Sequence, residues 1–220
     1  MQRTLLFGIG GIIIGITLGF WLANSLNRNM AVTGALPSDH LAMPGIASPG
    51  TAQDDIQQLI ELSEREPQNF AVQMRTGDLY AQIGRFDSAI EFYKRGIELR
   101  PDDPKAHLVL GNAYFDSRKF DLAAEQYGKV VGFEPENHDA RSDLAGALIE
   151  MDAPELDRAV NELQRVIEAV PDHNAALYYS ALAHIKRGEK EKAGEFITRL
   201  RTARPDSHLV TRLDQMLAGN

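Results

Sequence analysis

The sequence predicts an all-α protein: a right-handed solenoid of about four helix hairpins with a capping helix at each end, preceded by one N-terminal transmembrane helix. Two observations predict the solenoid. Prolines recur at nearly constant spacing, and two apolar patterns of helical period lie between successive prolines. A third observation, an uncharged run of twenty residues near the N-terminus, predicts the membrane helix.

The repeating prolines set the length of each unit. They are Pro67, Pro101, Pro135, Pro171 and Pro205, separated by 34, 34, 36 and 34 residues. Proline lacks an N–H and clashes with the preceding helical turn, so each one is expected to end a helix. The two apolar patterns within a unit are separated by a break, which reads GRFD from residue 84, RKFD from residue 118 and RGEK from residue 187. Each unit is therefore predicted to be a helix hairpin.

The repeats are predicted to occupy residues 70–205, flanked by two capping helices. Pro154 lies inside a two-residue insertion in the third unit, so we expect a longer turn between its helices. Ser207 is a plausible N-cap of the last helix. The expected segments are a capping helix at 54–66, repeats at 70–103, 104–137, 138–173 and 174–205, and a second capping helix at 206–220.

Residues of matching size recur in phase in the four units. One position of the first helix holds a small residue in every unit: Gly77, Gly111, Ala145 and Ala181. One position of the second helix always holds alanine: Ala89, Ala123, Ala159 and Ala193. Four residues later comes a large residue: Tyr93, Tyr127, Leu163 and Ile197. On these residues the chain resembles the tetratricopeptide repeat family. The family's tryptophan is replaced by Gln73, His107, Arg141 and Leu177, so the resemblance lies in the packing core.

The resemblance implies a concave groove lined by the first helix of each repeat. The implied groove is apolar with an acidic middle, which favours a basic and apolar protein or peptide partner. Only Lys105 and Asn112 could imitate the basic clamp with which some family members grip chaperone tails. The residues expected to bind the partner are Met74, Asp78, Lys105, Leu108, Asn112, Phe115, Asp116, Ser142, Ile149, Tyr178 and Leu182.

Composition argues against several other functions. From residue 54 onward the chain carries 21 basic and 30 acidic residues, so it lacks the basic stripe that a nucleic acid partner requires. It has no cysteine, which excludes disulfides and thiolate metal sites. No catalytic motif occurs, and the six histidines never pair at the i, i+4 spacing of a helical metal site. We therefore expect a binding protein that is not an enzyme and has no cofactor or metal.

The uncharged run at residues 4–23 is long enough to cross a bilayer as a helix, and Trp21 suits an interfacial anchor. The alternative is a signal peptide cut before Leu26, which would release a secreted soluble protein. Arg3 precedes the run, so the positive-inside rule places the repeats outside the cytoplasm, in the periplasm of a Gram-negative cell. Residues 24–53 lack helical periodicity and are predicted to be a flexible linker.

Gly11, Gly15 and Gly19 recur every four residues within the predicted membrane helix. Such a row allows two membrane helices to approach closely, which suggests a homodimer or a contact with another membrane protein. The alternative is that glycine is simply common in membrane helices.

Two functions follow from these observations. The first is a membrane-anchored adaptor or scaffold that holds a protein segment in its groove during envelope protein assembly or secretion. The second resembles the repeat domains of cytochrome c maturation proteins, which present an unfolded apoprotein. Genome neighbourhood would discriminate between them.

Overall fold

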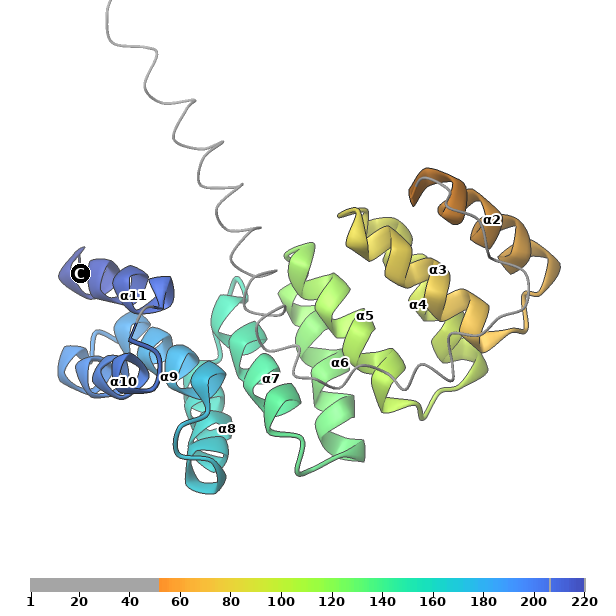
Figure 1. Cartoon of the computed structure of the whole chain (residues 1–220). Helices are drawn as coiled ribbons and strands as arrows, with labels where there is room; N and C mark the ends of the chain where they lie inside the picture. Colours follow the sequence, from red (N-terminus) through yellow and green to blue (C-terminus); the bar gives the residue numbers. More distant parts are fainter. Residues whose placement is uncertain (1–51, 206, 220) are drawn as a thin grey trace, which may run out of the picture. The chain divides into compact units, whose positions relative to one another are not determined.

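The computed structural model of the chain describes residues 52–205 and 207–219, which form ten α-helices and no strand (Figure 1). The predicted all-α class is confirmed for this part of the chain. The helices are α2 (Ala52–Arg65), α3 (Phe70–Gln82), α4 (Phe86–Leu99), α5 (Pro104–Asp116), α6 (Phe120–Phe133), α7 (His138–Glu150), α8 (Leu156–Ala169), α9 (Asn174–Lys186), α10 (Lys190–Ala203) and α11 (His208–Gly219).

Two sequence predictions fall outside the described residues. The predicted membrane helix 4–23, with Gly11, Gly15 and Gly19, is one, and all but the end of the predicted linker 24–53 is the other. Within the described ranges, no helix has both the length and the apolar character needed to cross a membrane. The chain divides into two compact units, and nearly all the described helices belong to the second, Ile56–Asn220.

A polar cap two residues after each closing proline starts the next helix. Its side chain accepts a hydrogen bond from a backbone N–H of the first turn, which the helix itself leaves without a partner. Ser207 does so as predicted, because its Oγ accepts from the backbone N–H of Leu209 at 3.3 Å. The caps of the repeats are Asn69, Asp103, Asn137 and His173, which accept from Val72, Ala106, Ala140 and Ala176 at 3.3, 3.0, 2.9 and 3.3 Å.

The two helices of each hairpin meet at a seam between a small and a large residue. A Cβ atom added at Gly77 would lie 2.5 Å from the ring of Tyr93, and one at Gly111 would lie 2.7 Å from the ring of Tyr127. Both tyrosines come from the second helix of their hairpin, so these contacts explain the glycines. The third and fourth hairpins have the smaller Leu163 and Ile197 at this place and carry Ala145 and Ala181 opposite them. On α11 the corresponding residue is Gln215, which is exposed.

The turns inside the hairpins require a left-handed residue. Gly84 and Gly188 have φ angles of 75° and 73°, which suit glycine. The second hairpin uses Arg118 at the same place, with φ 61°. In the third hairpin the segment from Met151 to Glu155 forms a longer turn, in which the backbone N–H of Glu155 donates to the Leu148 carbonyl at 3.0 Å.

Successive hairpins stack through different helices along the array. The second helix of one repeat contacts the first helix of the next at the α4–α5 and α6–α7 junctions. At the third junction α9 contacts both α8 and the first helix α7, because Gly146 of α7 lets the Tyr179 ring lie against its backbone. At the other end, Gln73 and Thr76 of α3 donate to α2 carbonyls at 3.4 and 3.5 Å.

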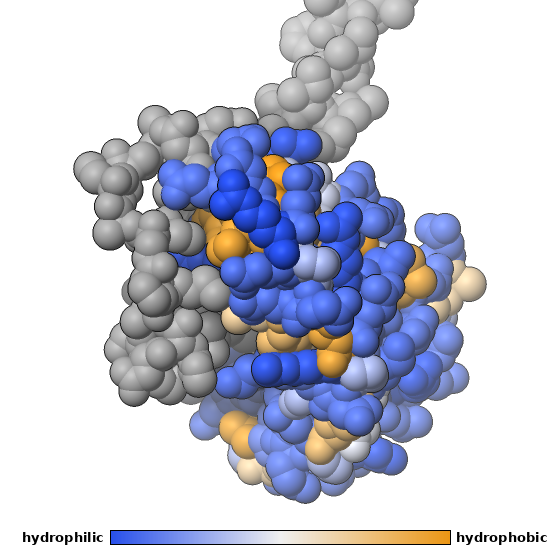
Figure 2. Space-filling view, turned by 90° about the vertical axis from the view of Figure 1, so that its right-hand side faces the viewer, coloured by the Kyte–Doolittle hydropathy of each residue, from blue (hydrophilic) through white to orange (hydrophobic). Residues whose placement is uncertain are grey.

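The surface at the α2 end is mainly hydrophilic, and its apolar residues form small, separate patches (Figure 2). A polar outer face is typical of the end helix of a repeat array, since no further repeat covers it.

Candidate protein-binding surface

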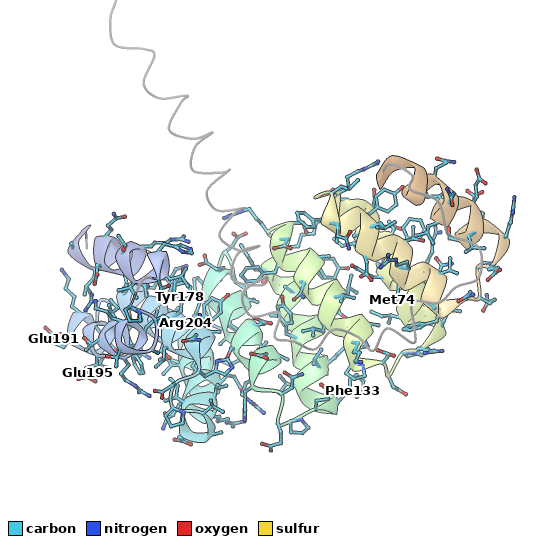
Figure 3. All side chains as sticks on the ribbon, in the orientation of Figure 1. Met74, Phe133, Tyr178, Glu191, Glu195 and Arg204 are labelled. Carbon is cyan, nitrogen blue, oxygen red and sulfur yellow. The ribbon has the colours of Figure 1, made fainter. Side chains whose placement is uncertain are left out.

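Seven of the eleven residues predicted to bind a partner are accessible on α3 and α5. Lys105 is exposed, and the other six are half-buried. Met74, labelled in Figure 3, lies on α3, and its sulfur packs against Gly96 of α4. Phe115 meets Phe120 edge to face, with ring centroids 5.2 Å apart. We call this set the α3–α5 surface: Met74, Asp78, Lys105, Leu108, Asn112, Phe115 and Asp116.

The other four predicted residues are buried in α7 and α9. Ser142 and Ile149 have no exposed surface, and Tyr178 and Leu182 are 4% and 3% exposed. In this part of the array the first helices touch one another directly, α7 with α9 and α9 with α11, which covers the sides of α7 and α9 that the family resemblance assigned to the groove. Tyr178, labelled in Figure 3, packs edge to face on Tyr179 at 5.2 Å. A partner therefore has no access to these four side chains in this structure.

Tyrosine hydroxyls from the second helices reach polar residues of the α3–α5 surface. Tyr93 of α4 donates to the Asp78 carboxylate at 2.8 Å, and Tyr127 of α6 donates to the Asn112 side-chain oxygen at 2.8 Å. Burial raises the pKa of Asp78, and the hydrogen bond from Tyr93 opposes that shift. The tyrosines of the hairpin seams thus also fix two polar side chains of the surface.

Two further carboxyls, one on α5 and one on α7, form no hydrogen bond or ion pair with another described residue. Burial raises the pKa of Asp116 to about 6. The pKa of Asp143 on α7 rises to about 7, mainly by burial and further by the Asp139 charge, while the His173 charge opposes the rise. Both groups are therefore partly protonated near neutral pH.

The two neighbouring acids do have partners. Asp139 lies 3.1 Å from His173 Nε2, and this hydrogen bond lowers the pKa of its carboxyl. Lys186 Nζ lies 3.3 Å from the Glu150 carboxylate and donates to the carbonyl oxygen of Ile149 at 2.9 Å. The acidic middle predicted for the groove thus contains both paired and unpaired carboxyls.

Sequence reasoning missed Asp143, Tyr179 and the roles of the seam tyrosines. Asp143 and Tyr179 occupy the same position of their repeats, and the family resemblance does not assign that position to the groove. In the first two repeats that place holds Arg75 and Val109, so no recurring residue type marks it. The pairing of Tyr93 with Asp78 and of Tyr127 with Asn112 had a weak signal, because both pairs are separated by fifteen residues.

A separate pocket lies at the turn between α2 and α3. Arg100 stacks over the Phe70 ring there, with its guanidinium carbon 4.2 Å from the ring centroid. It contains none of the residues predicted to bind a partner. Its lining consists of Arg65, Glu66, Pro67, Gln68, Asn69, Phe70, Ala71, Leu99 and Arg100. Within residues 52–205 and 207–219, no three His, Cys, Asp or Glu side chains are grouped so that they could hold a metal ion.

Family models match most of the helical array. A model described as TPR repeat matches residues 77–118, and a model described as tetratricopeptide repeat matches residues 108–150 and 144–208. The chain belongs to the tetratricopeptide repeat family. The resemblance drawn from the seam residues is thereby confirmed, and tetratricopeptide proteins of this kind are typically non-enzymatic interaction modules. No curated protein sequence matches the chain.

Several solved structures share the tetratricopeptide fold of this chain. A crystal structure of MamA is 19% identical, with a TM-score of 0.61, and the match covers 77% of this chain and 92% of MamA. MamA 41-end from Desulfovibrio magneticus RS-1 is 17% identical, with a TM-score of 0.65 and coverage of 72% and 89%. A second MamA structure is 20% identical, with a TM-score of 0.63 and coverage of 70% and 83%. At these identities the likeness concerns the fold alone.

Proposed function

We propose that this chain is a membrane-anchored tetratricopeptide adaptor that binds a segment of another protein on the α3–α5 surface. The observation that carries the proposal is a group of accessible apolar side chains, Met74, Leu108 and Phe115, on two first helices of adjacent repeats. Polar groups that can orient a bound segment surround them, among them Asn112 and Asp116. Apolar anchors inside a polar rim are typical of protein interfaces.

The membrane part of the proposal rests on the sequence. The uncharged run at residues 4–23 supports a retained anchor, and Arg3 before it supports an extracytoplasmic location for the repeats. A role in envelope protein assembly or secretion follows from that location. A glycine row at Gly11, Gly15 and Gly19 supports close contact between two anchors.

The binding surface is tested by crosslinking the full chain in its native membrane and identifying the captured proteins by mass spectrometry. Leu108→Ala with Phe115→Ala should reduce capture of the specific partners about thirtyfold, since two lost anchors cost about 2 kcal/mol or more. The matched control is Leu122→Ala with Phe133→Ala, which removes the same side chains from the second helix α6, where they are 41% and 44% exposed. Equal capture by both double variants would reject the α3–α5 surface.

The anchor is tested separately in the same cells. Alkaline carbonate washing should leave the protein in the membrane, and protease added to spheroplasts should digest the repeats. A mature protein that begins near Leu26 would instead identify residues 4–23 as a cleaved signal peptide.

A further inference from the structure

His107 of α5 is a buried histidine with a hydrogen-bond partner at each ring nitrogen. The side chain is 2% exposed. Its Nε2 lies 2.7 Å from the carbonyl oxygen of Pro101, in the turn before α5, and its Nδ1 lies 2.8 Å from Oε1 of Gln126 on α6. Phe133, labelled in Figure 3 at the end of α6, packs on the ring with the two centroids 5.8 Å apart. The imidazole thus joins three segments: the Pro101 turn, α5 and α6.

Both partners of the His107 ring are hydrogen-bond acceptors. A carbonyl oxygen can only accept, so Nε2 carries a proton. The amide of Gln126 is oriented by Glu125, because Gln126 Nε2 donates to a carboxylate oxygen of Glu125 at 3.3 Å. Turning this amide over would place its oxygen against that carboxylate, so Oε1 faces His107. Nδ1 therefore carries a proton as well, and a histidine with a proton on both ring nitrogens is an imidazolium cation.

The third repeat contains the same arrangement with a permanent cation. Arg141 is the fourth residue of α7, as His107 is of α5, and Glu162 is the seventh residue of α8, as Gln126 is of α6. Arg141 donates from one terminal nitrogen to the carbonyl oxygen of Pro135 and from the other to Glu162. Each of the two side chains thus joins the preceding proline turn to the second helix of its hairpin. The guanidinium supplies two donors at every ordinary pH, whereas imidazole supplies them only when it is protonated.

We infer that His107 is held as an imidazolium and forms a pH-dependent link between α5, α6 and the Pro101 turn. The neutral ring has one donor, so loss of the proton leaves one buried acceptor facing a bare nitrogen, which is unfavourable. The link therefore stabilises the second repeat at mildly acidic pH and weakens as the pH rises. It acts on α5, which carries Leu108 and Phe115 of the α3–α5 surface, but it concerns the fold and needs no bound partner.

The charged groups around the ring belong to α6 and to the turn before α5. On α6, the pKa of the Glu125 carboxyl is lowered chiefly by its hydrogen bond with Lys129, and the His107 charge adds a smaller effect in the same direction. In the turn, the Asp103 carboxylate accepts from a backbone N–H in the first turn of α5 at 3.0 Å, and Arg100 stacks on an aromatic ring of α3. The Glu125 charge favours the imidazolium, while the positive end of the α5 dipole opposes it, so the two oxygen acceptors decide the protonation state.

Nitrogen NMR of the His107 ring in the full chain tests the protonation state directly. At pH 6 both Nδ1 and Nε2 should carry a proton, and the neutral ring should appear only as the pH is raised. Unfolding in urea tests the consequence for stability. Between pH 8 and pH 5.5 the folding constant of the native chain should rise about tenfold more than that of His107→Gln, a difference of about 1.4 kcal/mol. Asp116 and Asp143, which also titrate in this range, are present in both chains, so their effects cancel in the comparison.

Two further variants locate the effect. Gln126→Leu removes one acceptor and keeps the histidine, so a single donor suffices and the pH dependence should fall to that of His107→Gln. The control is His208→Gln, the same substitution at an exposed histidine of α11, which should keep the native pH dependence. A single protonated ring nitrogen at pH 6, as a turned Gln126 amide would produce, overturns the inference even if a variant fails to fold. Equal pH dependence of the native chain and His107→Gln also overturns it.

Discussion

The guanidinium of Arg141 donates a hydrogen bond to the carbonyl oxygen of Pro135, six residues earlier, at 2.8 Å. Gln73 and His107 reach the carbonyls of Pro67 and Pro101 from the same place in their repeats, at 3.4 and 2.7 Å. Leu177 has no polar group, and Arg199 of α10 takes over by donating to Pro171 at 2.6 Å. Three of the four residues that replace the family's tryptophan thus bind their first helix to the preceding proline turn, and in the fourth repeat Arg199 of the second helix makes the equivalent bond.

Arg141→Leu should destabilise the fold by about 2–3 kcal/mol. Arg141 also pairs with Glu162 of α8, and their side chains are only 10% and 16% exposed, so its loss leaves a largely buried carboxylate without its main partner. Urea unfolding measures the change. Adding Glu162→Gln to Arg141→Leu should recover part of the loss. If Arg141→Leu is as stable as the native chain, Arg165, 4.0 Å from Glu162, has replaced it.

Gly111→Ala should destabilise the second hairpin despite alanine's better helix propensity. The new methyl would press on the buried Tyr127 ring, and overpacking costs about 1–3 kcal/mol against a propensity gain of about 1 kcal/mol. In a Tyr127→Leu background the same change should be neutral or stabilising, because the third hairpin pairs Ala145 with Leu163. Thermal unfolding of the double-mutant cycle measures the coupling. Additive effects would show that the seam pair is not responsible.

Arg118→Gly should stabilise the chain by about 0.5–1 kcal/mol. Arg118 has φ 61°, where Gly84 and Gly188 stand in other hairpins, and this region is unfavourable for a side chain. The gain is reduced by the lost stacking of Arg118 over Phe120, 5.4 Å from the ring centroid. Gly188→Ala is the reverse change and should destabilise. Calorimetry compares the two, and shifts of the same sign would contradict the explanation.

Asp143→Asn should stabilise the chain at pH 8 and have little effect at pH 4. The pKa of Asp143 is raised to about 7 in the fold, so its protonated form contributes stability at low pH that is lost as pH rises through 7. Asparagine does not titrate and avoids this loss. Charged or titratable groups around Asp143 are Asp139, His173, Tyr127 and Tyr179. Melting temperatures of Asp143→Asn and of the control Asp102→Asn, at an exposed residue, are compared with those of the native chain across this pH range. A gain in melting temperature that is independent of pH would refute the assignment.

Much of the fold was predictable because the same physical requirement recurs in every repeat. Proline cannot continue a helix, and the Tyr93 and Tyr127 rings fit only against glycine, so these residues return at a fixed spacing. The hairpins and their family follow from that recurrence. The seven residues of the α3–α5 surface are accessible in the structure, and their binding role stays a prediction.

The buried part of the predicted groove could not be read from the sequence. Ile149 and Tyr178 occupy places that remain accessible in the first two repeats, and they are buried where α9 touches both α7 and α11 directly. The α7–α9 contact brings Tyr179 against Gly146, and these two residues have no counterparts of the same type in the other repeats. Spacing identifies what repeats, and contacts between first helices that differ along the array lie beyond it.

The exposed Gln215 on α11 has a consequence for engineering longer arrays. It stands where the other first helices carry glycine or alanine, so a second helix docked there in the usual way would meet an amide side chain at the point of closest approach. Duplicating an internal unit such as 104–137 copies a matched seam and should lengthen the protein without redesign. Grafting a helix onto α11 should succeed only after Gln215→Ala, because the glutamine side chain prevents the close approach that a second helix needs.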